Sequence, residues 1–205
     1  MAEIIRPGEG RGMISGIILA SGLSSRMKRE KLTLAVEGIP MLERVIRAAT
    51  ASTLDEILLV YQKDEIRDLG QKYRLSLVHN EHPEYGQSAA VKAGVKCACP
   101  ESDGFMFLVG DQPYVSAVTI DRLITVFKKD MSRIVVPVYG SRRGNPVIFS
   151  ASHKRELLLL DGDKGGRAVM DTLQNLISVV AIQDEREAMD VDTEEAYEKI
   201  KNGPV

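Results

Sequence analysis

The sequence contains few of the features that mark disulfide-rich domains, zinc proteins or membrane proteins. Cysteine occurs only as Cys97 and Cys99, and no cluster of histidine or further cysteine accompanies this pair. A tetrahedral zinc site therefore lacks ligands, and the pair is best explained as two small apolar residues near a helix end. No apolar run approaches the roughly 18 residues that a membrane span requires. We expect a chain of this length to fold on a hydrophobic core, without disulfides or a structural metal.

An excess of charge of one sign is missing as well. The chain has 27 Lys and Arg residues against 29 Asp and Glu residues, a net charge of −2. This balance disfavours a protein whose main task is to bind nucleic acid through its overall field. The first residues contain no apolar secretory signal, and their proline and glycines indicate a flexible leader. We expect a cytoplasmic protein with a leader over residues 1–12 and one domain over residues 13–205.

Short apolar runs alternate with amphipathic stretches from Ser15 onward, which is typical of a mainly parallel sheet covered by helices. The pattern predicts strands over 16–19, 56–61, 75–78, 105–109, 134–138, 147–149 and 179–182. It predicts helices over 41–49, 66–73, 88–96, 120–127, 153–160, 167–176 and 194–202. Residues 139–144 indicate a turn between two antiparallel strands, at a mixed edge of the sheet. The predicted fold class is α/β, three-layered and Rossmann-like, with a mainly parallel, mixed sheet.

The segment from Leu19 to Lys31 follows the first predicted strand, at the sheet edge where ligands bind in such folds. Its small residues allow the backbone to approach phosphate oxygens, and Arg26 and Lys31 would neutralise their charge. The segment has neither the G-x-G-x-x-G pattern of dinucleotide-binding proteins nor the G-x-x-x-x-G-K-[ST] pattern of P-loop nucleotidases. Composition alone leaves a solvated basic loop as the alternative.

The order of residues in this loop resembles the signature of the MobA-like nucleotidyltransferases, and most closely that of the molybdenum cofactor cytidylyltransferases. The family pattern is approximately L-A-[AG]-G-x-S-x-R-M-G-x-x-K, and the matching residues are Leu19, Ala20, Gly22, Ser24, Arg26, Met27 and Lys31. Two positions depart from it, because Ser21 replaces Ala or Gly and Lys28 replaces the usual Gly. The resemblance implies catalytic roles for Arg26 and Lys31. It implies nucleotide binding by Leu19, Ala20, Ser21, Gly22 and Ser24.

Further segments resemble other blocks of the family in the same order, so that the resemblance extends from residue 14 to about 200. Residues 86–94 are similar to its G-x-S-x-S-x-x-x-G block, and residues 109–115 to its metal-binding G-D-x-P segment. Residues 144–149 resemble G-H-P-V-L-F with Asn145 in place of His, and 162–167 and 190–193 resemble the remaining blocks. The implied roles are nucleotide binding by Gln87, Ser88 and Gly110, metal binding by Asp111 with Asp192 or Asp190, and acceptor binding by Asn145, Lys164 and Arg167.

Each of these segments also has a purely structural interpretation. Ser88 could cap the first turn of a helix, and Asp111 could be an ordinary loop carboxylate. Asp192 and Thr193 could cap the helix that begins at Glu194. Mg²⁺ nevertheless prefers one or two carboxylates together with phosphate oxygens and water, which a well-placed Asp111 can provide. Capping and metal binding do not exclude each other.

The resemblance implies the fold and the activity of a nucleotidyltransferase. The expected reaction is Mg²⁺-dependent transfer of a cytidylyl group from CTP to the phosphate of molybdenum-bearing molybdopterin, with release of pyrophosphate. CTP is expected over GTP because the cytidylyl enzymes tend to carry Ala where Ser21 stands, and the guanylyl enzymes Gly. An apo-molybdoenzyme or its chaperone would be a protein partner. The alternatives are a guanylyltransferase, a nucleotidyltransferase with another acceptor, a nucleotide-binding reductase and a cofactor chaperone.

Overall fold

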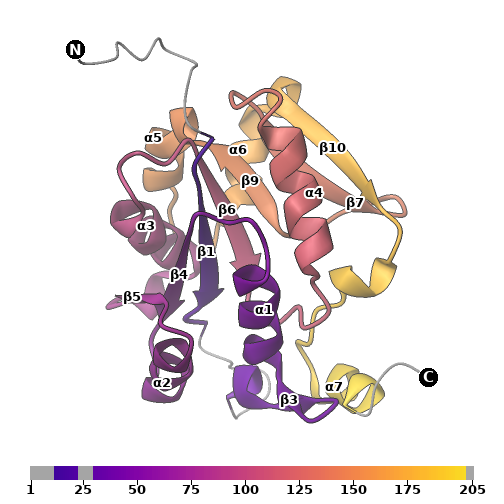
Figure 1. Cartoon of the computed structure of the whole chain (residues 1–205). Coiled ribbons are helices and arrows are strands. Elements are labelled where there is room, and N and C mark those ends of the chain that lie inside the picture. Colours follow the sequence, from indigo (N-terminus) through magenta and orange to yellow (C-terminus); the bar gives the residue numbers. More distant parts are fainter. Residues whose placement is uncertain (1–11, 23–29, 202–205) are drawn as a thin grey trace.

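The computed structural model describes residues 12–22 and 30–201 of the chain. Eight strands in this part of the chain form one sheet: β1 (Ile14–Ala20), β4 (Glu56–Tyr61), β5 (Ser76–His79), β6 (Gly104–Val109), β7 (Ile134–Tyr139), β8 (Arg142–Arg143), β9 (Val147–Ser150) and β10 (Ile177–Ile182). Their order across the sheet is β10, β7, β9, β6, β1, β4, β5, and β8 pairs with β7 (Figure 1). Every predicted strand is present, with ends shifted by a residue or two.

Most neighbouring strands in the sheet are parallel. β1 runs parallel to both β4 and β6, β4 runs parallel to β5, and β7 runs parallel to β10. β9 is antiparallel to both of its neighbours, β6 and β7. The predicted turn over 139–144 is confirmed, but its placement at an edge of the sheet is wrong. The later strand β10 pairs with the outer side of β7, so that the antiparallel strand lies inside the sheet.

Helices cover both faces of this sheet, which gives the three layers predicted from the sequence (Figure 1). Adjacent strand residues alternate between two apolar cores, because successive side chains of a strand point to opposite faces. Ile18 and Leu59 belong to one core, and Ile17 and Leu58 to the other. The first core packs against α1 (Met41–Thr50), α2 (Asp64–Lys72) and α4 (Ala117–Phe127). The second packs against α3 (Gln87–Cys97), α5 (Lys154–Leu158) and α6 (Gly166–Thr172).

Two predicted helices are shorter than expected. Residues 153–160 contain only α5, preceded by the 3₁₀ turn Ala151–His153. Residues 167–176 contain α6 and then the 3₁₀ turn Gln174–Leu176, because Leu173 leaves the helical conformation at φ −121° and ψ 36°. Periodicity could not locate these breaks, since the apolar side chains on either side of them still face the core.

A short hairpin that the pattern did not predict joins the sheet region to the last helix. It consists of β2 (Ala35–Val36) and β3 (Ile39–Pro40), whose turn has positive φ at both Glu37 and Gly38. Such a turn matches the right-handed twist of the two strands. Val36 packs with Ile200 of α7 (Glu194–Ile200), so the hairpin holds this helix beside the start of α1.

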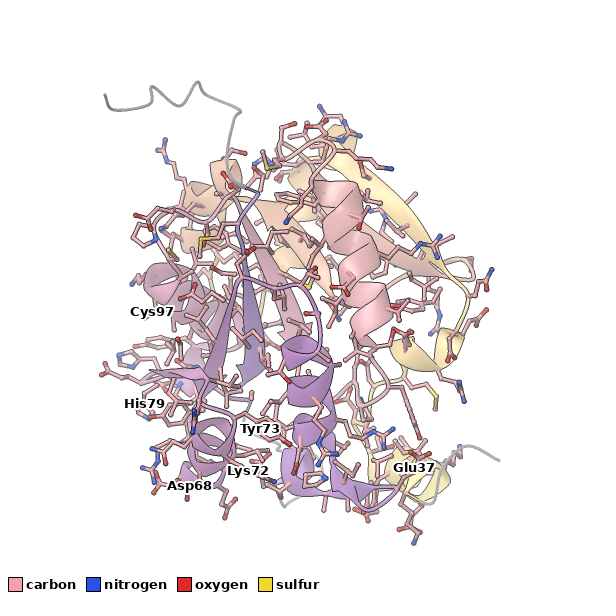
Figure 2. The ribbon with its side chains drawn as sticks, viewed as in Figure 1. Glu37, Asp68, Lys72, Tyr73, His79 and Cys97 are labelled. Atoms are coloured by element: carbon pink, nitrogen blue, oxygen red, sulfur yellow. The ribbon has the colours of Figure 1, made fainter. Side chains whose placement is uncertain are left out.

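Some predicted features lie outside the described residues or at the end of a helix. The leader over 1–12 lies outside the described residues except for Gly12, and so do Ser24 and Arg26. Cys97 is the last residue of α3 and is exposed, as Figure 2 shows, so its predicted place at a helix end is confirmed. Among the described residues, no helix has both the length and the apolar character to cross a membrane.

Candidate active site

A cavity of about 750 Å³ opens where β1 and β6 end at their carboxyl termini. The loops after β1, β5 and β6, the loop between α5 and α6, and the segment before α7 surround it. The lining residues are 19–22, 31–32, 83–87, 109–111 and 161–163, together with Ala90 and Asp192. The cavity therefore lies at the edge of the sheet where the sequence places a ligand.

Most of the predicted nucleotide and metal residues face this cavity. The lining includes Leu19, Ala20, Ser21, Gly22, Lys31, Gln87, Gly110, Asp111 and Asp192. Asp190, Ser88 and the predicted acceptor residues Asn145, Lys164 and Arg167 are not part of the lining. The structure thus brings together most of the predicted nucleotide-binding and metal-binding residues. It leaves the predicted acceptor-binding residues outside the cavity lining.

Lys31 lies between two carboxylates at one end of the cavity. Its Nζ is 2.6 Å from Oδ2 of Asp111 and 2.8 Å from Oδ1 of Asp192. Burial lowers the pKa of this ammonium, but the charges and hydrogen bonds of Asp111 and Asp192 outweigh burial, and the net pKa is raised. Lys31 therefore stays charged near neutral pH, and the two carboxylates share one cation.

The backbone explains how these distant acids meet. Asp111 follows the end of β6 by two residues, and the N–H of Val191 donates to its carbonyl oxygen at 3.2 Å. This hydrogen bond holds the segment before α7 against the loop after β6. Thr193 caps α7 by accepting from the N–H of Ala196 at 3.2 Å, as predicted, which leaves the Asp192 carboxylate facing Lys31.

Asp190 has a different environment from Asp192. Its Oδ1 accepts from Nε2 of the buried Gln112 at 2.6 Å. Burial raises its pKa, and the negative charges of Asp111 and Asp192 raise it further. Among the described residues, no group of three or more His, Cys, Asp or Glu side chains is placed to hold a metal ion. The acids that face one shared cation are Asp111 and Asp192.

The start of α3 is joined to the loop over 161–165 on another side of the cavity. The N–H of Gln87 donates to Oδ1 of Asp163 at 3.2 Å, and the N–H of Ser88 donates to the carbonyl of Gly162 at 3.3 Å. Gly86 has φ 72°, and a Cβ there would lie 2.8 Å from Cα of Asp163. The loop and the helix therefore meet backbone to backbone.

The structural alternative for Ser88 is wrong. Gly86 is the N-cap residue of α3, and the Ser88 hydroxyl donates to the carbonyl of Tyr85 at 3.2 Å instead of accepting from the helix. Asp163 takes the place of a capping side chain. Nothing in the local sequence could show this, because Asp163 and Gln87 are 76 residues apart.

Sequence reasoning also missed part of the cavity rim. Tyr85 is 57 % exposed, and its ring is stacked on that of His82 with centroids 5.1 Å apart. Asp161 and Glu84 add carboxylates to the lining. The available signal for Tyr85 was its position in a Pro- and Gly-containing loop directly after a predicted strand.

The predicted acceptor residues lie on neighbouring segments. Asn145 is half-buried, and its carbonyl accepts from the hydroxyl of Tyr139 at 2.8 Å. Lys164 and Arg167 are exposed at the start of α6. The described structure gives them no contact with the residues around Lys31.

Known proteins are similar in sequence to most of this chain. A family model described as the MobA-like NTP transferase domain matches residues 16–177. The purine catabolism protein PucB of Bacillus subtilis is 28 % identical over 197 residues, covering 91 % of this chain and 95 % of PucB. A probable molybdenum cofactor guanylyltransferase of Natranaerobius thermophilus is 30 % identical over 142 residues, covering 69 % of this chain and 67 % of that protein.

Solved structures show the same fold. The crystal structure of Rv0371c from Mycobacterium tuberculosis has a TM-score of 0.83 and 25 % identity, covering 93 % of this chain and 98 % of that one. A nucleotidyl transferase from Methanothermobacter has a TM-score of 0.80 and 24 % identity, covering 93 % and 96 % of the two chains. The predicted nucleotidyltransferase fold is confirmed. Because the family match extends from β1 to the first residue of β10, the chain belongs to the family of MobA-like NTP transferase domains and is a nucleotidyltransferase.

Proposed function

We propose that this enzyme transfers a cytidylyl group from CTP to the phosphate of molybdenum-bearing molybdopterin and releases pyrophosphate. The observation that carries the proposal is the ammonium of Lys31, which Asp111 and Asp192 share at the wall of a cavity of about 750 Å³. A cavity of this size is at the upper end of typical small-molecule sites, which suits two substrates held side by side.

A divalent cation fits the two carboxylates. Asp111 and Asp192 already converge on one positive charge, and two carboxylates with phosphate oxygens and water form a common Mg²⁺ site. When bound, Mg²⁺ would neutralise charge on the triphosphate. Rv0371c of Mycobacterium tuberculosis forms a complex with manganese, which supports a divalent cation in this family.

The chain's own residues would act mainly by positioning and charge. The acceptor's phosphate oxygen attacks the α-phosphorus of CTP, and the bond from this phosphorus to the oxygen that bridges to the β-phosphorus breaks. Lys31, together with Arg26, would stabilise the charge that develops on the departing pyrophosphate. The backbone of Leu19, Ala20, Gly22 and Gly110 would approach the nucleotide closely. Lys164 and Arg167, although outside the cavity lining, are the proposed contacts of the second anionic substrate.

A guanylyl transfer to the same acceptor is the second candidate. The relative from Natranaerobius thermophilus and one from Thermococcus gammatolerans, 27 % identical over 196 residues, are both described as probable molybdenum cofactor guanylyltransferases. Ser21 supports CTP instead, because its side chain is close in volume to Ala and reduces the room for a purine. The two candidates differ only in the base.

One experiment separates all of these functions. The purified protein is incubated with each of the four nucleoside triphosphates, Mg²⁺ and molybdenum cofactor, and pyrophosphate is measured. We expect release with CTP, only when both Mg²⁺ and the acceptor are present. Release with GTP instead would identify a guanylyltransferase. No release with any nucleotide would contradict the proposed acceptor and would indicate that the enzyme uses another one.

A further inference from the structure

Two buried polar side chains connect the end of β1 to the loop after β5. Nδ2 of Asn80 donates to Oγ of Ser21 at 2.9 Å, and the residues are 3 % and 5 % exposed. Ser21 lines the cavity, whereas Asn80 lies behind it and is not part of the lining. Asn80 therefore acts on the cavity through the residues that it contacts, of which Ser21 belongs to the lining.

The orientation of the Asn80 amide is fixed by its other neighbour. Its side-chain oxygen Oδ1 accepts from the backbone N–H of His82 at 3.2 Å. The backbone N–H of Asn80 donates to the carbonyl of Tyr61 at 2.7 Å. A backbone N–H can only donate, so the amide atom that faces His82 must be the oxygen. The amide nitrogen must then face Ser21.

This orientation determines what the Ser21 hydroxyl can do. The amide nitrogen of Asn80 can only donate, so Oγ of Ser21 must act as the acceptor in their hydrogen bond. The hydroxyl proton of Ser21 is therefore directed elsewhere, and the described residues offer it no acceptor. Because Ser21 lines the cavity, this proton is available to a ligand.

We propose that Asn80 is a positioning residue that makes Ser21 a hydrogen-bond donor to the nucleotide base. This inference rests on the proposed binding of a nucleotide in the cavity. Cytosine presents acceptors at N3 and O2, whereas uracil carries a hydrogen on N3 and cannot accept there. A donor directed at N3 would thus favour CTP over UTP, although their bases have nearly equal volume. A serine that is free to rotate would tolerate both.

The test measures nucleotide binding without an acceptor, by calorimetry with CTP and UTP in Mg²⁺. The variant Asn80→Asp keeps the shape and the acceptor for His82, but its carboxylate takes the proton of Ser21. We expect CTP affinity to fall about tenfold, and Ser21→Ala to cause a similar fall. In the Ser21→Ala background, Asn80→Asp should change CTP affinity by less than about twofold, since the hydroxyl that Asn80 orients is absent.

Two controls separate orientation from added charge. Asn175→Asp adds the same charge on an exposed residue outside the cavity lining and should leave CTP affinity unchanged. Inorganic triphosphate, which has no base, should bind wild type and Asn80→Asp equally. Weaker triphosphate binding by Asn80→Asp would overturn the inference, because the effect would then be electrostatic.

The remaining outcomes are equally distinct. Equal losses from Asn80→Asp with and without the Ser21 hydroxyl, or no loss at all, would overturn the inference while leaving nucleotide binding intact. Failure of the wild-type protein to bind any nucleotide would instead contradict the proposed function. If Asn80→Asp does not fold, Asn80→Ala removes the donor without adding charge. We expect it to weaken CTP binding about threefold, and only when the Ser21 hydroxyl is present.

Discussion

Asp111 carries one of the two carboxylates proposed to hold the divalent cation, so its charge matters more than its shape. Asp111→Asn keeps the shape and removes the charge. We expect turnover to fall by about two orders of magnitude or more, roughly 3 kcal/mol of transition-state stabilisation, with little change in the melting temperature. Asp171→Asn, on the exposed side of α6, serves as the control. Near-normal turnover of Asp111→Asn in saturating Mg²⁺ would contradict the metal role.

Lys31 and a bound cation would each neutralise charge on the same two carboxylates, Asp111 and Asp192. Lys31→Met removes the ammonium between Asp111 and Asp192, and the repulsion between the two carboxylates should destabilise the fold by about 1–2 kcal/mol. Mg²⁺ can replace the lost charge, so it should raise the melting temperature of Lys31→Met more than that of the wild type. Lys199→Met, which removes the exposed ion pair with Glu195, is the matched control. An equal response to Mg²⁺ in all three proteins would contradict replacement of the Lys31 charge by the cation.

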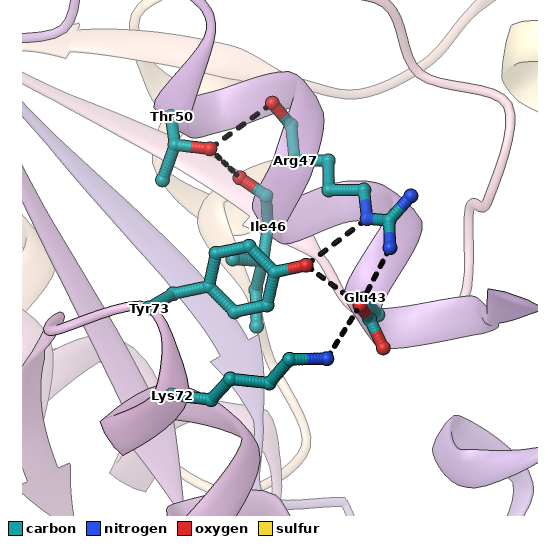
Figure 3. A network of polar contacts seen from close by, with 6 residues as sticks. All are labelled: Glu43, Ile46, Arg47, Thr50, Lys72 and Tyr73. Atoms are coloured by element: carbon teal, nitrogen blue, oxygen red, sulfur yellow. Dashed lines mark hydrogen bonds and ion pairs between the residues drawn. The ribbon is translucent and has the colours of Figure 1, made fainter.

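Between elements, one buried carboxylate of α1, Glu43, binds side chains at the end of α2. Oε1 of Glu43 accepts from the hydroxyl of Tyr73 at 2.6 Å, from Arg47 at 2.8 Å and from Lys72 at 3.0 Å, as Figure 3 shows. The Tyr73 hydrogen bond, aided by Lys72 and Arg47 and opposed by burial, lowers the pKa of Glu43 from 4.5 to about 2. Figure 2 shows Lys72 and Tyr73 together on the side of α2 that faces α1.

This network predicts a dependence of stability on pH. The pKa of Glu43 is lower in the folded state, so its contribution is fully present above about pH 4.5 and is lost as the pH falls towards 2. Lys72 and Arg47 are 61 % and 52 % exposed, and solvent screening reduces the expected contribution to roughly 1–2 kcal/mol. Denaturant unfolding of Glu43→Gln against wild type should show this difference at about pH 7 and a shrinking one between about pH 5 and 2. A constant difference would contradict it, and Glu65→Gln, exposed on α2, should change little.

The elements that could be predicted from the sequence are those whose spacing of apolar residues is evident within a short stretch of the chain. In α1, Met41, Val45 and Ala49 repeat at helical spacing, and all three are fully buried. The hairpin over 35–40 escaped prediction because its strands are two residues long and its turn begins with Glu37, which rarely adopts positive φ. The position of β9 escaped because strand order depends on which later strand covers β7, and no local pattern encodes this.

At the scale of the whole molecule, the cavity depends on segments that meet only in the folded chain. The resemblance identified Gln87 and Asp111 because each belongs to a contiguous motif. It could not identify Asp163 as the partner of Gln87, or Asn80 as the partner of Ser21, because those pairs are 76 and 59 residues apart. Single motifs predicted much of the lining, and only the fold revealed the rest of it and what holds it in place.

The close contact of Gly86 with Asp163 allows this long-range dependence to be tested. Gly86→Ala combines a positive φ of 72° with a Cβ 2.8 Å from a backbone atom of Asp163. Gly38→Ala has a similar φ of 78° in the β2–β3 turn, with nothing within 4 Å. We expect Gly86→Ala to lose about 1–3 kcal/mol more than Gly38→Ala in denaturant unfolding, and to weaken nucleotide binding as well. Equal losses of unfolding free energy in the two variants, with unchanged nucleotide binding, would show that the loop over 161–165 can move to accommodate the added methyl group.

The central position of β1 has a consequence for synthesis on the ribosome. β1 is the earliest strand of the sheet to be made, yet its partners are far along the chain: Ser15 pairs opposite Glu56, and Ile14 opposite Gly104. Until β6 has emerged, one side of β1 has an unpaired backbone, an edge on which nascent chains aggregate. Such non-local pairing slows folding. The growing chain gains its complete cavity only once Asp192 has been translated.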